Sequence, residues 1–134
     1  MFRIFPYTLV TVVLYNVLVF VTNIQMQDII FAVGLPSGND WAVTVGDGLL
    51  AFALGLLFIE LISATSTRAS SVINHGLSTV VFTLCIIEFL LVYPCGTSTF
   101  FLLTMISLVD VVAGYSITIM TARRDLAVGD HFGR

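Results

Sequence analysis

Apolar residues fill four long stretches of the chain, and short polar segments separate them. The stretches cover about residues 6–33, 42–63, 72–93 and 97–121. Each is long enough for a helix to cross the hydrocarbon core of a bilayer, which takes about 20 residues. In lipid only a helix or a closed barrel satisfies the backbone, and segments of this length and number do not suit a barrel. The pattern therefore predicts four transmembrane helices.

The polar segments predict the turns between these helices. Residues 34–40 (GLPSGND) form the clearest break, because proline, glycine and an Asn-Asp pair favour turns. Trp41 follows at a position typical of an interfacial anchor. Residues 64–71 form a Ser/Thr-rich link, residues 95–98 allow only a tight hairpin link, and residues 122–134 form a polar tail. Such short links predict antiparallel neighbouring helices.

Arginines predict the orientation of the helices. The chain has 5 basic residues, all of them arginine. With four spans, the N-terminus, the link between the second and third helices and the C-terminal tail share one side, which the positive-inside rule makes cytoplasmic. We therefore predict an all-α integral membrane four-helix bundle forming one domain over residues 1–134, antiparallel up-down-up-down, with both termini cytoplasmic. The arginines that carry this prediction are Arg3, Arg68, Arg123, Arg124 and Arg134.

The composition agrees with a membrane environment. Apolar residues make up 58% of the 134 positions and charged residues 10%, with a mean hydropathy of +1.08, whereas a soluble domain carries about 25% charged residues. The net charge of -3 excludes the basic surface that nucleic-acid binding needs. Two cysteines form neither a disulfide framework nor a metal site. We expect a multi-pass protein of the bacterial inner (cytoplasmic) membrane, in contact with lipid, with no nucleic acid, metal or cofactor.

Small residues on the predicted helices indicate where helices pack. Small side chains let two helices approach closely in lipid, where hydrogen bonds and van der Waals contacts drive association. The second helix carries such a stripe beside Asp47, and the fourth carries one beside Asp110. These stripes are expected to mark the inside of the bundle. The predicted helix-packing residues are Gly48, Ala51, Gly55, Ser107 and Gly114.

Ionisable and amide side chains within the predicted spans are the candidates for chemistry. A charged residue at the bilayer centre costs about 2.5–3.5 kcal/mol on insertion scales. Counting from the helix ends places Asp110 near the midplane, level with Asn16. The same count places Asp47 and Glu88 near the outer surface, and Glu60 and His75 near the cytoplasmic surface. The candidate proton, ion or partner-contact residues are Asp110, Glu88, Asp47, Asn16, Glu60 and His75.

Each of these residues has a structural interpretation beside a functional one. Glu60 and His75 form either a structural pair across the short link or a point where protons enter, since histidine titrates near neutral pH. Asp47 and Glu88 are either solvated near the outer surface or share a cation or proton. Asp110 is a protonated, hydrogen-bonded interior residue, a contact with a partner subunit, or part of an ion path.

The sequence contains no nucleophile with a base, no metal set and no phosphate-binding loop. We therefore expect that the protein is not an enzyme, and we assign it to no family. The pattern favours a non-catalytic accessory or scaffold subunit that packs against other membrane proteins or itself as a homo-oligomer. The alternative is a small oligomeric proton-coupled transporter or ion channel that uses its intramembrane carboxylates.

Overall fold

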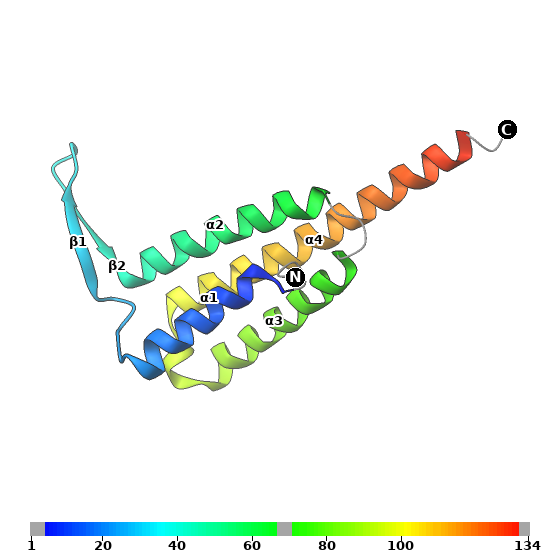
Figure 1. Cartoon of the computed structure of the whole chain (residues 1–134). Helices are drawn as coiled ribbons and strands as arrows, with labels where there is room; N and C mark the ends of the chain where they lie inside the picture. The colour runs from blue at the N-terminus through cyan, green and yellow to red at the C-terminus, as the bar shows by residue number, and fades with distance from the viewer. Residues whose placement is uncertain (1–4, 67–70, 132–134) are drawn as a thin grey trace.

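The computed structural model describes residues 5–66 and 71–131, which form four α-helices and a β-hairpin (Figure 1). A π-helical turn (Val17–Val21) extends the first helix, and a 3-10 turn (Tyr93–Cys95) precedes the last. The elements are α1 (Tyr7–Asn16), β1 (Ile29–Gly34), β2 (Asp40–Thr44), α2 (Val45–Ser66), α3 (Ser71–Leu91) and α4 (Ser98–His131).

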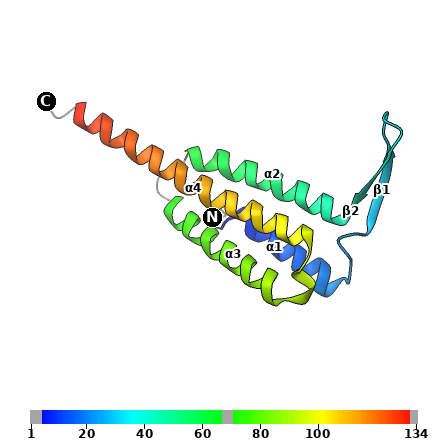
Figure 2. The same cartoon turned by 180° about the vertical axis from the view of Figure 1, so that it is seen from behind.

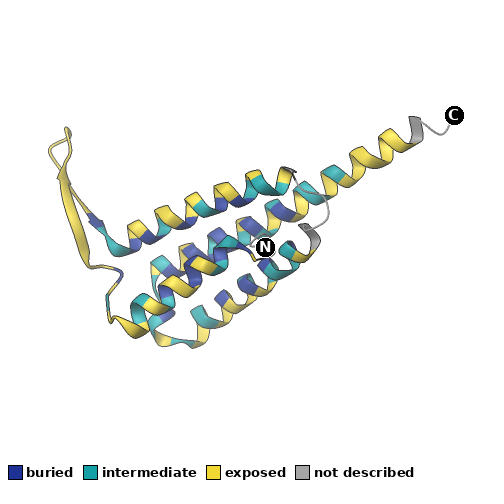
Figure 3. Cartoon of the chain, viewed as in Figure 1, coloured by how far each residue is buried: buried dark blue, intermediate teal, exposed yellow. Residues whose placement is uncertain are grey.

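The helices lie side by side, with α1 and α4 each packed against both α2 and α3 (Figures 1 and 2). The buried side chains lie where these helices meet, and the outward faces are exposed and largely apolar (Figure 3). In water such faces would be unfavourable, but in lipid they need no protein cover. The apolar core consists of Val12, Tyr15, Met26, Leu49, Ala53, Leu57, Val81, Cys85, Cys95, Phe100, Leu103 and Ile106.

Three of the helices are long and apolar enough to cross a membrane: Val45–Thr65, Ile73–Leu91 and Ser98–Gly129. The first helix with its π-helical turn, Tyr7–Val21, is apolar but shorter. It spans roughly 22 Å at the α-helical rise, whereas the hydrocarbon core measures about 30 Å. Three of the four predicted segments are therefore confirmed as helices long and apolar enough to cross a membrane.

The prediction of a first helix over residues 6–33, and with it an all-α fold, is wrong. The helix ends after Val21, and Asn23 adopts the left-handed conformation with φ 56°. Asparagine tolerates this conformation better than most residues, so it commonly terminates helices. The backbone N–H of Ile24 donates to the Leu18 carbonyl and closes the end of the helix.

Residues 29–44 form an antiparallel hairpin in which Gly34 pairs with Asp40. Its strands carry β-branched and aromatic residues, which favour strands. The predicted break over residues 34–40 is the hairpin turn, where Gly38 has φ 86°. The turn residues therefore indicated a reversal correctly, but the segments on both sides are strands. Trp41 belongs to β2 and is exposed.

The base of the hairpin is fixed to the helices, whereas the rest projects away from them (Figures 1 and 2). The N–H of Val45 donates to the Asp28 carbonyl, and the N–H of Gly46 donates to the Met26 carbonyl. A Cβ atom at Gly46 would lie only 2.6 Å from Oγ1 of Thr99. Glycine is thus required where the hairpin, α2 and α4 meet.

The last helix is longer than the sequence pattern predicts. Residues 122–131, expected as part of a polar tail, continue α4 as a helix past the ends of the other helices (Figure 1). The segment ARRDLAV consists mainly of good helix formers, so the helix persists after the apolar pattern stops. The bounds of α2 and α3 lie within about three residues of the predicted bounds.

Tyr15 ties the end of α1 to the link between α3 and α4. Its side chain is 0% exposed. Its hydroxyl donates to the Pro94 carbonyl at 3.0 Å and lies 2.8 Å from Oγ1 of Thr97. The ring meets Phe100 edge to face, with 4.7 Å between ring centroids.

Removing this hydroxyl should destabilise the fold. We expect Tyr15→Phe to lower the free energy of unfolding by about 1–3 kcal/mol, because it removes the hydrogen bonds of a buried side chain to half-buried partners. Reversible unfolding in mixed detergent micelles, followed by circular dichroism, measures the change. Tyr93→Phe is the matched control, because Tyr93 is 97% exposed. Equal losses in the two variants would contradict this role of Tyr15.

Candidate functional site

Two groups of polar side chains lie among the helices. The first, which we call the interior cluster, lies between the start of α1, the end of α2, the start of α3 and the middle of α4. The second lies in an apolar groove between α1 and α3. The interior cluster consists of Thr8, Glu60, Asn74, His75, Ser78 and Asp110.

Asp110 faces its own helices, with 1% of its surface exposed. Oγ1 of Thr8 donates to its Oδ2 at 3.2 Å, and the Ser78 hydroxyl lies next to the same carboxyl group. Asp110 was expected to be level with Asn16, but its contact on α1 is at Thr8. The two residues are not level, because α1 with its π-helical turn ends near residue 21 and not near residue 33, so Asn16 lies near the end of this helix.

Glu60 connects three helices at one end of the structure. It is buried, its Oε2 accepts from the backbone N–H of Tyr7 at 2.9 Å, and its Oε1 accepts from Nδ2 of Asn74 at 2.9 Å. The first N–H groups of a helix have no partner within the helix, and its N-terminus favours negative charge. Glu60 of α2 therefore caps α1.

The structural pair expected between Glu60 and His75 does not form, because the partner of Glu60 on α3 is the preceding residue, Asn74. The His75 ring points toward α4, where it lies near Asp110 and 5.9 Å from the ring of Tyr115. His75 is 2% exposed, and neither ring nitrogen has a hydrogen-bond partner among the described residues.

Gly114 makes room for this histidine. A Cβ atom at Gly114 would overlap the His75 ring. The predicted packing role of Gly114 is thus specific: the absent side chain lets the imidazole lie against α4. Ser107, another predicted packing residue, is buried one turn before Asp110 and lies next to Cys85.

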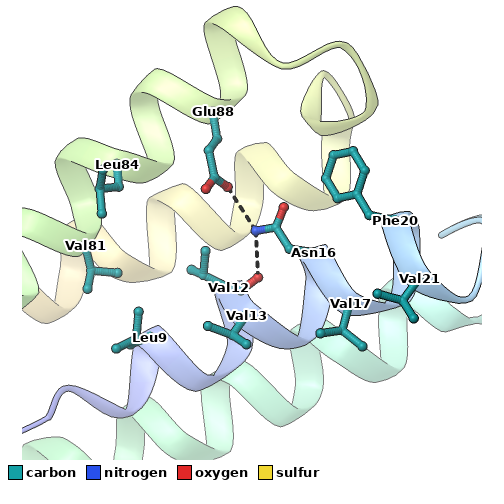
Figure 4. A pocket seen from close by; sticks show the side chains of 10 residues that line it. All are labelled: Leu9, Val12, Val13, Asn16, Val17, Phe20, Val21, Val81, Leu84 and Glu88. Atoms are coloured by element: carbon teal, nitrogen blue, oxygen red, sulfur yellow. Dashed lines mark hydrogen bonds between the residues drawn. The ribbon is translucent and has the colours of Figure 1, made fainter.

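The second group lies in a groove with a volume of 360 Å³ between α1 and α3, which we call the α1/α3 groove (Figure 4). Nδ2 of Asn16 donates to Oε2 of Glu88 at 3.0 Å and to the Val12 carbonyl at 3.1 Å. The remaining lining is apolar. The lining residues are Leu9, Val12, Val13, Asn16, Val17, Phe20, Val21, Val81, Leu84 and Glu88.

Cys95 lies behind this pair of residues, in the link between α3 and α4. Its Sγ is 4.0 Å from Oδ1 of Asn16, a weak hydrogen bond in which the thiol donates. Burial, with a smaller effect of nearby Glu88, raises the pKa of Cys95 to about 11. The residue is therefore a neutral thiol at neutral pH and not a reactive thiolate.

Asp47 does not belong to either group. It is exposed at the start of α2, where its Oδ2 accepts from the N–H of Thr44 at 2.9 Å and from Oγ1 of Thr44 at 2.8 Å. Glu88 has its own partner in Asn16. The structure thus gives the two acids separate partners and does not bring them together in a shared site, which was one of the two interpretations.

The three predicted packing residues of α2 face outward, so the prediction that they mark the inside of the bundle is wrong for this helix. Gly48, Ala51 and Gly55 are exposed, and a Cβ atom at Gly55 would have no neighbour within 4 Å. The buried face of α2 consists instead of Leu49, Ala53, Leu57 and Glu60. The position of Glu60 was the better signal for the buried face of α2, because an acid in an apolar helix avoids lipid. Glu60 follows Leu57 by one turn, so the two residues lie on the same face.

Sequence reasoning does not single out Thr8 or Tyr15, although both are buried and hydrogen-bonded across helices. A threonine in an apolar helix gives no distinguishing signal, since its hydroxyl can bond its own backbone. Within residues 5–66 and 71–131, no group of three or more His, Cys, Asp or Glu residues could hold a metal ion.

Comparison of the chain with protein-family models, with curated proteins and with solved structures finds no match. The three long apolar helices place it in the class of proteins with helices suited to crossing a membrane. Any function must therefore be argued from its own geometry.

The fit of His75 against Gly114 gives a stability test. We expect Gly114→Ala to lower the midpoint of thermal unfolding, because the methyl group displaces the buried imidazole; overpacking costs typically about 1–3 kcal/mol. Gly76→Ala is the control in the same region, since a Cβ atom there has no neighbour within 4 Å. Differential scanning fluorimetry in detergent measures both. A loss in Gly76→Ala as large as that in Gly114→Ala would argue against the fit.

Proposed function

We propose that the chain is a multi-pass integral membrane protein that forms one antiparallel four-helix bundle and serves as a non-catalytic accessory or scaffold subunit. Three helices are suited to crossing a membrane, and α1 lies along them. We place the protein in the bacterial inner membrane with both termini cytoplasmic. The single observation that carries the subunit role is the exposed surface formed by α2 and the hairpin.

The arginines support this orientation. His75 packs on Gly114, and α3 begins one turn before His75, so α4 beyond about residue 118 passes the start of α3. Arg123 and Arg124 lie on this exposed extension of α4. The hairpin lies at the opposite end of the helices (Figure 1). Arg3, Arg68 and Arg134 lie outside the described residues.

The face of α2 with Gly48, Ala51 and Gly55, which we call the α2 outer face, is open to another helix. Small residues in this spacing allow close helix–helix packing in a membrane. The face adjoins the hairpin, because a Cβ atom at Gly48 would lie 3.6 Å from Cδ1 of Ile30. A partner helix on α2 would thus also meet β1.

The hairpin is a second surface on which we expect a partner to pack. Every residue of β1 is exposed, and a two-stranded hairpin is at best marginally stable alone in water. Its free strand edges offer unpaired N–H and C=O groups. The exposed large apolar residues of the hairpin are Ile29, Ile30, Phe31, Val33, Leu35 and Trp41. A partner subunit, or a second copy of this chain, would cover both the hairpin and the α2 outer face.

Enlarging the α2 outer face should abolish this association. The full chain, purified from its native membrane in mild detergent, is expected to run as an assembly larger than a monomer in size-exclusion chromatography with light scattering. The double variant Ala51→Leu, Gly55→Leu should shift it to the monomer, because the larger side chains hold the partner helix away. Ser116→Leu, at an exposed site on α4, is the control. A wild-type protein that runs as a lone monomer would contradict the subunit role.

A second candidate is proton-coupled transport, and the interior cluster favours it. Two carboxyl groups and an imidazole lie together in the helix interior. Such groups are expensive to retain in a membrane and often mark proton relays. The ring nitrogens of His75, which have no partner within residues 5–66 and 71–131, provide both a donor and an acceptor beside Asp110.

Proton flux through liposomes tests this candidate. If it holds, the wild-type protein dissipates an imposed pH gradient faster than protein-free liposomes, as an internal pH-sensitive dye reports. Asp110→Asn should then reduce the rate to near the protein-free value, because the amide cannot release a proton. Asp47→Asn removes an exposed acid and should leave the rate unchanged. Equal flux in wild type and Asp110→Asn would exclude Asp110 from any such path.

A further inference from the structure

Glu88 is a carboxylate on the wall of an apolar groove. Of the residues that line the α1/α3 groove, Glu88 and Asn16 carry the polar side-chain groups, and both are half-buried (Figure 4). Their hydrogen bond joins α1 to α3 across the groove. In the proposed orientation the groove faces the acyl chains of the bilayer, where an ionised carboxylate is expensive.

The described part of the chain places no cation beside this carboxylate. Its partner Asn16 is a neutral amide, which donates a hydrogen bond but brings no charge. Arg123 and Arg124 lie on the extension of α4, at the other end of the helices. His75 lies 13 residues before Glu88 on α3, roughly 20 Å along the helix. The groove therefore combines apolar walls with an uncompensated negative group.

We propose that the α1/α3 groove binds an amphiphilic cation, a molecule with an apolar body and one ammonium or other onium group. The cationic group lies at Glu88, and the apolar body lies along the valines and leucines of α1 and α3. A lipid acyl chain would fill the same walls but would leave the carboxylate without a counter-charge. Charge complementarity thus favours the cation.

The shape of the groove fits a ligand of this kind. From the level of Asn16 and Glu88, the lining continues to Leu9 on α1 and to Val81 on α3. The distance along the helix is seven residues in both cases, which corresponds to about 10 Å of apolar wall. The volume of 360 Å³ lies within the range of about 300–1,000 Å³ typical of small-molecule pockets. On α1 the apolar lining also continues past Asn16 to Val17, Phe20 and Val21, so the polar pair has apolar wall on both sides (Figure 4).

This site is separate from the proposed subunit contact. The α2 outer face and the hairpin do not line the α1/α3 groove. Binding of the cation therefore requires neither the partner nor proton flux, and the proposal can fail while the others hold.

Two probes with the same apolar chain and opposite charge provide the test. The full chain in nanodiscs of zwitterionic lipid is dialysed to equilibrium against octyltrimethylammonium or octanesulfonate, and empty nanodiscs give the background. We expect saturable binding of octyltrimethylammonium at one site per chain and no saturable binding of octanesulfonate. Saturable binding of octanesulfonate to the same extent would overturn the proposal.

Two variants test separately the charge of Glu88 and the space in the groove. Glu88→Gln should weaken octyltrimethylammonium binding by about tenfold or more, because it removes a partly desolvated counter-charge. Leu84→Trp should abolish octyltrimethylammonium binding, since the larger side chain fills the groove while Glu88 remains. Asp47→Asn removes one acid outside the groove and should not change the dissociation constant.

An unchanged dissociation constant in Glu88→Gln would overturn the proposal. If that variant does not fold, the difference between the two probes on the wild-type protein and the loss in Leu84→Trp still decide it. Binding that Leu84→Trp leaves intact would place the cation elsewhere and would equally contradict the assignment.

Discussion

In the proposed membrane setting lipid cannot solvate a carboxylate, and the helices surround Asp110 and Glu60 with polar partners. Asp110 accepts a hydrogen bond from Thr8, 102 residues away in the chain. Glu60 accepts bonds from the start of α1 and from Asn74 on α3. Asp110 thus joins the last helix to the first, and Glu60 joins α2 to the helices before and after it, α1 and α3. Because an unpaired polar group inside a membrane costs several kcal/mol, these bonds restrict how the helices can rotate relative to one another.

A lipid environment also accounts for most of the exposed apolar side chains and leaves a few features that it does not account for. Exposed leucine, isoleucine and phenylalanine on a helix surface are what a bilayer requires, so they carry no information about partners. Three features are not explained by lipid contact alone: the outward Gly48, Ala51 and Gly55 of α2, the apolar hairpin, and the carboxylate of Glu88 in a groove. Our proposals rest on these features and on the acids of the interior.

Prediction from the sequence succeeded where the apolar pattern and a lipid environment both favour a helix. The long apolar runs of α2, α3 and α4 can only be helices if they lie in lipid, and the bounds of α2 and α3 and the start of α4 followed from polar links. Over residues 29–33, at the end of the predicted first helix, apolar residues hid a change from helix to strand, because valine, isoleucine and phenylalanine suit a buried helix and a strand equally. The left-handed Asn23 and the hairpin pairing decided for the strand.

Taken alone, the sequence determined that the chain has membrane-length apolar helices and that its buried chemistry comes from a few acids, amides and one histidine. Only the tertiary structure decided which of these groups meet. Asn74 and His75 are adjacent in sequence, yet about 100° apart around α3, so the first reaches Glu60 and the second lies against Gly114. Helix rotation sets such contacts, and it depends on the packing of all the helices together, which no single segment encodes.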